Sequence, residues 1–337
     1  MKILYGIQTT GNGHLSRARE IIPYLLNRLQ VDVILSGPKN QLRIDFPIQK
    51  HYRGFTFYYL RKGAINWWKT LFKNNPFQFI IDVIKCPVHE YDLVINDFEP
   101  VSAWACFLKR KRCIALSNQY ALSLKNAPRA KKSLFNSLSI VKYFAPSREG
   151  YGFHFKKFDK RVFLPIIRSE VRALTPSIGD HIVVYLPAYG LRKLENIFSH
   201  FPSTEWHIFT PHVTKLRQHG NITFFPIEEQ IFLKNLSNCG GVGTAAGFTT
   251  PTEALFLNKP LLVIPIKSQI EQLFNATVLH SMGVTVLKSL KKKNLPQIKQ
   301  WLEGRKTIPV FFPDETQKLI DRLLLDYIKG QLALDQL

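Results

Sequence analysis

Residues 2–29, KILYGIQTTGNGHLSRAREIIPYLLNRL, decide the fold. The run 2–9 is apolar and has the length of a buried strand, whereas 14–29 has the apolar spacing of a helix. The glycines of the intervening TTGNGH permit a tight turn. A buried strand that leads through a glycine turn into a helix is typical of the first unit of a parallel α/β sheet.

The same alternation of strand and helix continues along the chain. We predict further strands over 32–36, 55–60, 91–97, 113–117, 181–187, 206–210, 222–226 and 260–266, and helices over 101–108, 191–200, 229–236, 252–257, 269–282 and 315–328. Such alternation predicts right-handed βαβ units, with helices on both faces of parallel sheets.

The length and one polar stretch predict two domains. At roughly 150 residues per domain, 337 residues suggest two. The stretch LTPSIGD (174–180) is typical of a linker, and it indicates a boundary within about 166–180. We therefore expect an α/β chain of two doubly wound, Rossmann-like domains, 1–165 and 166–337, with the ligand at the carboxyl ends of the strands in the cleft between them.

Positive charge is concentrated in the first domain. The chain has 46 Lys and Arg against 24 Asp and Glu, a net charge of +22. Residues 1–165 hold 27 basic and 10 acidic residues (+17), and residues 166–337 hold 19 and 14 (+5). A hydrophobic fraction of 45% excludes a disordered polycation. The charge predicts an anionic partner: nucleic acid, an acidic membrane or a phosphorylated ligand.

The turn after the first strand is the first candidate for chemistry. Gly11, Asn12 and Gly13 would present the backbone N–H groups at the start of the next helix to an anion. The pattern is not a full dinucleotide fingerprint, because Ser16 replaces the third glycine, and it is not a P-loop. His14 begins the helix at the predicted cleft, where an imidazole can act as a general base. The alternative is a histidine that only lines the helix start.

The segment NDFEP (96–100) ends the predicted strand 91–97. Asp97 and Glu99 would point into the cleft, where a carboxylate can accept a proton or orient a substrate hydroxyl. The alternative is helix capping, since Glu99 and Pro100 also suit the first turn of the following helix.

A glycine-rich loop precedes a helix in the second domain, GGVGTAAGFTTPTEAL (240–255). Thr250 and Glu253 have the spacing of a capping box, with Pro251 at the first helical position. The loop is expected to present N–H groups and hydroxyls to an anion such as a diphosphate. Glu253 has two interpretations, the capping box or a ribose hydroxyl.

A cluster of polar side chains follows the predicted strand 260–266. Glu271, Gln272 and Asn275 fall within one sector of a helix, just after Gln269. Carboxylates and amides together supply both acceptors and donors for the hydroxyl groups of a sugar. The alternative is a solvated helix face.

These motifs together resemble the MurG-like glycosyltransferases of the two-domain GT-B fold. The resemblance rests on the GxGH turn and on GFTTPTEAL, KPLLVIPI and QIEQLFNA, and it covers about residues 1–285. The NDFEP segment is similar to a DFEP element in a less studied bacterial and archaeal branch of the family.

The resemblance implies a role for each motif. The second domain would bind a nucleotide sugar, most often UDP-linked, with Glu253 on the ribose and with Glu271 and Gln272 on the sugar. The first domain would bind the acceptor, with His14 as a base or phosphate contact and Asp97 as the other candidate base. The diphosphate would lie on Gly247, Phe248, Thr249 and Thr250. Glu271 departs from MurG, which has a glutamine there, so the sugar need not be N-acetylglucosamine.

No metal or cofactor is expected. Cys86, Cys106, Cys113 and Cys239 lack zinc-site spacing, and no DxD-type aspartate pair stands out. Helix N-termini and loop N–H groups would then stabilise the departing UDP. By analogy with the fold, the anomeric configuration would be inverted.

The segment 63–85 suggests contact with a membrane surface. Trp67, Trp68 and Phe72 cluster at helical spacing beside Lys69 and Lys73, a pattern typical of segments that lie on anionic membranes. A core helix with a buried strand is the alternative. No apolar run reaches the length of about 18 residues that a membrane-spanning helix needs.

We therefore expect an inverting glycosyltransferase that acts on a lipid- or polyprenyl-linked acceptor of the cell envelope. It would be cytoplasmic and bound peripherally to the inner face of the membrane. A UDP-sugar 2-epimerase of the same fold is one alternative. A basic nucleic-acid-binding protein is another, although no nucleic-acid-binding motif supports it.

Overall fold

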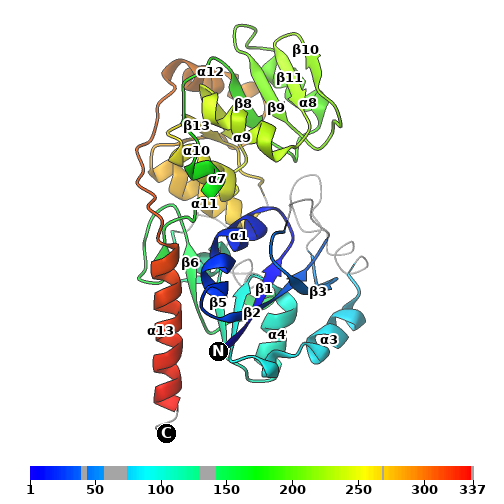
Figure 1. Cartoon of the computed structure of the whole chain (residues 1–337). Helices are drawn as coiled ribbons and strands as arrows, with labels where there is room; N and C mark the ends of the chain where they lie inside the picture. Colours follow the sequence, from blue (N-terminus) through cyan, green and yellow to red (C-terminus); the bar gives the residue numbers. More distant parts are fainter. Residues whose placement is uncertain (39–43, 57–73, 129–141, 268, 335–337) are drawn as a thin grey trace.

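The computed structural model describes residues 1–38, 44–56, 74–128, 142–267 and 269–334. Within these ranges the chain forms two sheets of seven strands, one in each half of the sequence (Figure 1). All strand pairs are parallel except β10 and β11. The predicted α/β fold with two Rossmann-like domains is confirmed.

The first sheet has the order β3-β2-β1-β4-β5-β6-β7. Its strands are β1 (Lys2–Gln8), β2 (Gln30–Ser36), β3 (Ile48–Tyr52), β4 (Leu93–Asp97), β5 (Cys113–Leu116), β6 (Glu149–Phe153) and β7 (Val162–Phe163), and its helices are α1 (Gly13–Leu26), α3 (Pro76–Lys85), α4 (Pro100–Leu108) and α5 (Asn118–Ser123), with a 3₁₀ turn at Val88–Glu90. The strand order reverses between β1 and β4, and in such sheets ligands bind outside the carboxyl ends at this point.

The second sheet has the order β10-β11-β9-β8-β12-β13-β14 and reverses between β8 and β12. Its strands are β8 (Ile182–Tyr185), β9 (Trp206–Phe209), β10 (Arg217–His219), β11 (Ile222–Phe225), β12 (Gly241–Thr244), β13 (Leu261–Val263) and β14 (Thr285–Val286), and its helices are α8 (Leu191–Phe198), α9 (Glu229–Asn238), α10 (Thr249–Phe256), α11 (Ile270–Ser281) and α12 (Leu295–Gly304), with a 3₁₀ turn at Lys292–Asn294. Between the two sheets the chain passes through the short helix α7 (Ser169–Arg172).

Several strands have no counterpart in the prediction. Of the predicted strand 55–60, residues 57–60 lie outside the described residues, and 55–56 form no strand. The edge strand of this sheet is β3. Its first four residues are exposed, and three of these four are polar, so β3 lacks a buried apolar run. In β6, Gly150 and Gly152 lie so close to Ala115 and Ala121 that a Cβ atom would clash. Glycine there permits close approach but weakens the strand signal.

The last helix, α13 (Thr316–Leu334), returns to the first domain (Figure 1). Arg112 donates to the carbonyl of Tyr327 at 2.7 Å, and the Tyr327 hydroxyl donates to the carbonyl of Asp92 at 2.9 Å. Tyr151 donates to the Asp326 carboxylate. The final helix therefore packs on the amino-terminal sheet although it follows the second domain in sequence.

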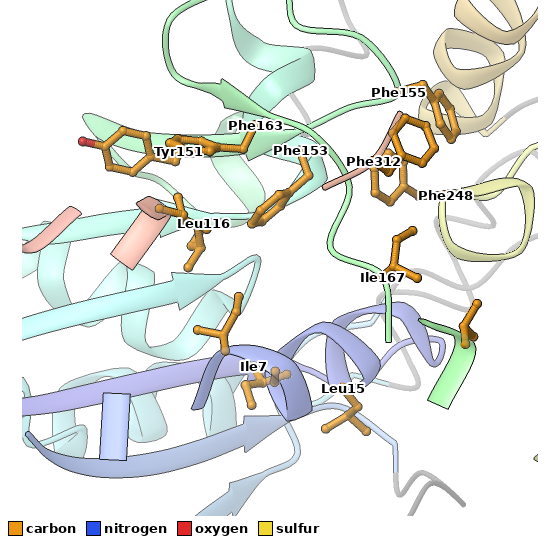
Figure 2. Close-up of a cluster of buried hydrophobic side chains, with 14 of the residues drawn as sticks. Ile7, Leu15, Leu116, Tyr151, Phe153, Phe155, Phe163, Ile167, Phe248 and Phe312 are labelled. Carbon is orange, nitrogen blue, oxygen red and sulfur yellow. The ribbon is translucent and has the colours of Figure 1, made fainter. Parts of the chain in front are cut away.

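A buried apolar cluster joins the domains near the cleft. Phe155 of the first domain and Phe248 of the second have ring centroids 5.0 Å apart, and Phe312, from the segment before α13, belongs to the same cluster (Figure 2). An aromatic pair of this kind contributes about 0.5–1.5 kcal/mol beyond its buried area. The cluster therefore favours the closed arrangement of the two domains.

Candidate active site

Loops from both sheets meet at the carboxyl ends of the strands. The turn after β1 leads into α1, and the loop after β12 leads into α10. A Cβ atom on Gly13 would lie 2.8 Å from the Thr249 hydroxyl, so the first turns of these two helices are in close approach across the cleft. Two helix N-termini that face one cleft create a positive potential suited to phosphate groups.

His14 and Asp97 form a buried pair at the reversal point of the first sheet. His14 is in the first turn of α1, and Asp97 is the last residue of β4. Nδ1 of His14 lies 2.7 Å from Oδ1 of Asp97. The carboxylate can only accept, and it lies nearer to Nδ1 than Nη2 of Arg17 does (2.7 against 3.2 Å), so we assign the proton to Nδ1, which leaves Nε2 as the basic nitrogen. Among the described residues, Nε2 has no hydrogen-bond partner.

Arg17 fixes Asp97 from the next turn of α1. Its Nε lies 3.0 Å from Oδ2, and its Nη2 contacts both carboxylate oxygens at 2.5 and 2.8 Å. Nη1 donates to Asn118 Oδ1 at 2.8 Å. Burial raises the pKa of Asp97, but the charges of Arg17 and His14 outweigh it and leave the pKa below its ordinary value. Asp97 is therefore an anion that orients His14, and it is fully shielded from solvent.

Of the two interpretations of Glu99, the structure supports helix capping. It is fully buried and caps α4 by accepting from the backbone N–H groups of Val101 and Ser102 at 2.6 and 2.7 Å. The hydroxyls of Ser36 and Ser102 also donate to it. Its carboxylate is occupied by the protein and does not reach the cleft.

An aromatic stack lies beside the His14 imidazole. Phe98 has a left-handed backbone (φ 56°), and its ring is stacked on His14 with a centroid distance of 6.3 Å and an interplanar angle of 9°. Phe144 lies 4.8 Å from Phe98 on a tilted plane. A strained backbone at a non-glycine residue is typical of functional sites, and here it brings an apolar ring next to the candidate base.

The start of α10 differs from the predicted capping box. The helix begins at Thr249 with Phe248 at the N-cap, so Thr250 is inside the first turn and no side chain caps the helix. Glu253 does not reach back to the loop. The uncapped N–H groups remain free for an anion, which is the property that the loop was expected to have.

Glu253 is held by an arginine from the connection between the domains. Nε of Arg168 lies 2.7 Å from Oε1 of Glu253, and its Nη1 contacts Glu229. Burial raises the pKa of Glu253; Arg168 lowers it only in part, and the net shift is upward. Among the described residues only Oε1 of Glu253 accepts a hydrogen bond, so Oε2 retains acceptor capacity.

The polar residues of α11 lie at three different places. Glu271 accepts a hydrogen bond from Gln119 of the first domain at 2.8 Å. Gln272 contacts the backbone N–H of Ile266 and the side chain of Gln269, at 3.0 and 2.6 Å. Asn275 is buried and donates to the carbonyl of Ala246 at 3.0 Å, which supports the glycine-rich loop from below. The hydrogen bond of Glu271 therefore reaches the opposite domain.

The cleft is nearly closed in this arrangement. Gly13, Ser16, Arg168, Thr249 and Glu253 are among the residues around a cavity of ≈ 20 Å³. A water molecule needs about 10–15 Å³ measured in the same way. A nucleoside diphosphate is far larger, so it fits into this cavity only if the surrounding residues move apart. A Cβ atom added at Gly247 would meet no atom of the described residues within 4 Å, so the loop has open space at that residue.

A family model described as glycosyl transferase family 1 matches residues 1–305. The chain belongs to this family. It is a glycosyltransferase, and no curated protein matches it at a significant level.

Solved glycosyltransferases share the fold. The chain is 13% identical to SnogD from Streptomyces nogalater (TM-score 0.52, covering 96% of this chain and 99% of that one). It is 13% identical to a UDP-glucosyltransferase from Polygonum tinctorium (TM-score 0.59, 97% and 98%) and 14% identical to Arabidopsis thaliana UGT89C1 complexed with UDP (TM-score 0.54, 97% and 99%). At these identities the likeness shows the GT-B fold.

Three residues of this glycosyltransferase were missed by the sequence analysis: Arg17, Arg168 and Gln119. Arg17 follows His14 by three residues, a spacing that places both on one helix face, and this signal could have found it. Arg168 and Gln119 contact residues that lie 85 and 152 positions away, and no local pattern reveals such pairs.

The remaining predictions concern a membrane and metals. Trp67, Trp68, Lys69, Phe72 and Lys73 lie outside the described residues. In the part of the chain that the structure describes, no helix is both long and apolar enough to cross a bilayer. No cluster of three or more metal-ligating acidic, histidine or cysteine side chains occurs within the same described ranges.

Proposed function

We propose that the chain is an inverting, MurG-like glycosyltransferase that moves a sugar from a UDP-sugar to a lipid-linked acceptor at an anionic membrane surface. The observation that carries the proposal is the His14–Asp97 pair, which lies across the cleft from the uncapped start of α10 and from Glu253. One side of the cleft can remove a proton, and the other can hold a nucleotide.

The proposed reaction uses the two sides together. Nε2 of His14 takes the proton of the acceptor hydroxyl while the acceptor oxygen attacks the anomeric carbon. The bond from that carbon to the UDP oxygen breaks, and attack from the opposite face inverts the configuration. The N–H groups at the start of α10 stabilise the charge that develops on the departing diphosphate. Asp97 stabilises the imidazolium that His14 becomes.

A UDP-linked donor is supported by Glu253 and by the structural neighbours. Oε2 of Glu253 is available to accept from a ribose hydroxyl, next to the N-terminus that would take the diphosphate. Two of the UGT89C1 structures are complexes with UDP and with UDP-L-rhamnose. A thermal-shift comparison of UDP-, GDP- and ADP-sugars tests the donor, with stabilisation expected only for the UDP-linked compounds. Stabilisation by another base alone would contradict this donor.

A membrane surface is supported by an exposed apolar face on α3 and α4. Phe77 is 79% exposed, Ile84 60% and Phe107 54%, and the two helices pack against each other. The basic stretch 109–112 follows α4 directly. Exposed aromatic and aliphatic side chains beside basic residues suit an anionic lipid surface, where each basic residue adds about 1 kcal/mol.

Vesicle binding tests this part of the proposal. The full chain should sediment with vesicles of phosphatidylglycerol and phosphatidylcholine. The variant Phe77→Ser/Phe107→Ser should bind at least about tenfold more weakly, because burial of each ring is worth about 1.5–3 kcal/mol. Phe311, which is 82% exposed near the start of α13, is the matched control, and Phe311→Ser should bind like the wild type. Equal binding by all three proteins would contradict the membrane face.

A further inference from the structure

Gln119 connects the two domains at the place where the donor sugar is expected. It lies in α5 of the first domain, directly after the carboxyl end of β5. Its Nε2 donates to Oε2 of Glu271 in the second domain at 2.8 Å. The neighbouring contact of Leu122 and Ala127 with Phe274 is apolar, so this polar pair lies at the edge of a dry patch between α5 and α11.

The other end of the Gln119 amide is an unused acceptor. Gln119 is 6% exposed, and its Oε1 accepts no hydrogen bond from any described residue. A buried acceptor left in this state costs about 1–3 kcal/mol. A water molecule or a ligand that donates to it would remove this cost. Gln119 also lines a small cavity with Phe98 and Ser117 on the acceptor side, so its amide lies between the two substrate regions.

We propose that Gln119 is a specificity-determining residue for the donor sugar. In the closed complex, a hydroxyl group of the sugar donates to Oε1 of Gln119, the acceptor that has no partner among the described residues, while Nε2 stays on Glu271. The contact with Glu271 holds the amide in the orientation that this hydroxyl needs. The inference rests on the proposed function, since it takes the surroundings of Glu271 as the sugar site.

This arrangement makes the selected group a hydroxyl. A site built to hydrogen-bond a hydroxyl rejects analogues that lack it, because its own buried groups are left unpaired. The preferred donor is therefore a nucleotide sugar with a free hydroxyl at this position, and the matching deoxy sugar is a poor donor. Because Gln119 belongs to the first domain, this contact forms only when the domains close, and sugar selection is tied to closure.

The first test separates sugar binding from nucleotide binding. In Gln119→Ala, the affinity for the best UDP-sugar should fall about 10- to 100-fold, because the buried sugar hydroxyl loses its acceptor, while the affinity for UDP stays within about twofold. The control Lys157→Ala removes an exposed ion pair with Glu315 that ties the first domain to the start of α13, and it should change neither affinity. Calorimetric titration measures both ligands on all three proteins.

The second test exchanges the two side chains. Gln119→Glu places two carboxylates in contact and should also weaken the UDP-sugar. Adding Glu271→Gln recreates the pair with its ends reversed and should restore a large part of the affinity. The ratio of kcat/KM for the parent sugar to that for its deoxy analogues should fall in Gln119→Ala and recover in the exchanged variant.

The outcomes distinguish the inference from the proposed function. If Gln119→Ala weakens UDP and the UDP-sugar equally, or neither of them, Gln119 does not contact the sugar and the inference is overturned, while the proposed function stands. No rescue by the exchanged pair would overturn it as well. A wild-type protein that binds neither UDP nor any UDP-sugar would overturn the proposed function and this inference with it.

Discussion

Each domain buries an arginine against a carboxylate at the cleft, but the two pairs are built differently. Arg17 contacts Asp97 through both Nε and Nη2, so one cation serves one carboxylate. Arg168 contacts Glu253 through Nε alone and turns Nη1 to Glu229. In the second domain, one cation is therefore shared between two acids.

The pKa shifts of the two carboxylates follow this difference. Burial raises both, yet the pKa of Asp97 ends below its ordinary value and that of Glu253 above it. Asp97 remains ionised because the charges of Arg17 and His14 outweigh its burial, and with its oxygens occupied it can only orient His14. Glu253 keeps one oxygen for a ligand. The number of donors around a buried acid therefore indicates whether it acts on the protein or on the substrate.

The largest effect should come from His14→Ala. Loss of a general base costs about 10²–10⁴ in kcat, whereas the affinity for the UDP-sugar should hardly change, because the imidazole belongs to the acceptor side. Steady-state kinetics and calorimetry measure the two quantities. Asp97→Asn should give a smaller loss of kcat with the same unchanged affinity. Full turnover in His14→Ala would contradict the role of His14 as the general base.

Glu253→Gln should give the next largest effect. Loss of a charged hydrogen bond to the ribose is worth about 1.5–3 kcal/mol, which corresponds to about 10- to 100-fold in UDP affinity. Glu229→Gln is the matched control, because it removes the other partner of Arg168 and leaves Glu253 in place. If both variants bind UDP equally well, Glu253 only pairs with Arg168, and neither of the two buried carboxylates contacts the substrate.

The fold was predictable because its signals are local. The buried strand β1 and the turn through Gly11 and Gly13 need only the period of the apolar residues and the freedom of glycine. The edge strand β3 was missed because its exposed residues carry no apolar alternation. An edge strand pairs on one side only, and its sequence need not reveal a buried face.

The candidate site was predictable by region but not by partner. The sequence indicated His14 and Asp97 separately, as competing bases, and the structure joins them as one pair. The two interpretations of Glu99 were separated only by its four donors, which lie on β2 and at the start of α4. Long-range partners decide the role of a polar residue, and spacing along one sequence does not contain them.

Arg17→Met should give a moderate effect with a clear dependence on pH. Removing the guanidinium leaves a buried carboxylate with only His14, which should cost about 3–5 kcal/mol of stability near neutral pH. In the wild type, a lowered pKa means that Asp97 stabilises the fold above its unfolded pKa and that this stability is lost as the pH falls through the folded value. In the variant only His14 opposes the effect of burial and the pKa of Asp97 rises, so stability should instead fall as the pH rises.

Denaturant unfolding between pH 4 and 8 measures this reversal. The acid limb of the kcat/KM profile of Arg17→Met should also move to higher pH, because a protonated Asp97 no longer orients His14. A wild-type profile in the variant would mean that Arg17 only packs against Phe153, over whose ring its guanidinium lies at 5.1 Å.

The smallest effect should be the pH dependence of donor affinity in the wild type. A raised pKa means that Glu253 takes up a proton at a higher pH than an ordinary glutamate, and a protonated carboxyl is a weaker acceptor for the ribose. Affinity for UDP-glucose should therefore fall severalfold as the pH is lowered through that pKa, whereas Glu253→Gln should bind weakly with little change.

UDP-glucose is the better probe, since the terminal phosphate of UDP itself titrates near a pKa of about 6. All other ionisable groups are present in both proteins, so the difference between the two curves isolates Glu253. Parallel curves would mean that Glu253 keeps its charge throughout, as Asp97 does. The Arg17–Asp97 and Arg168–Glu253 pairs would then differ only in their hydrogen bonds.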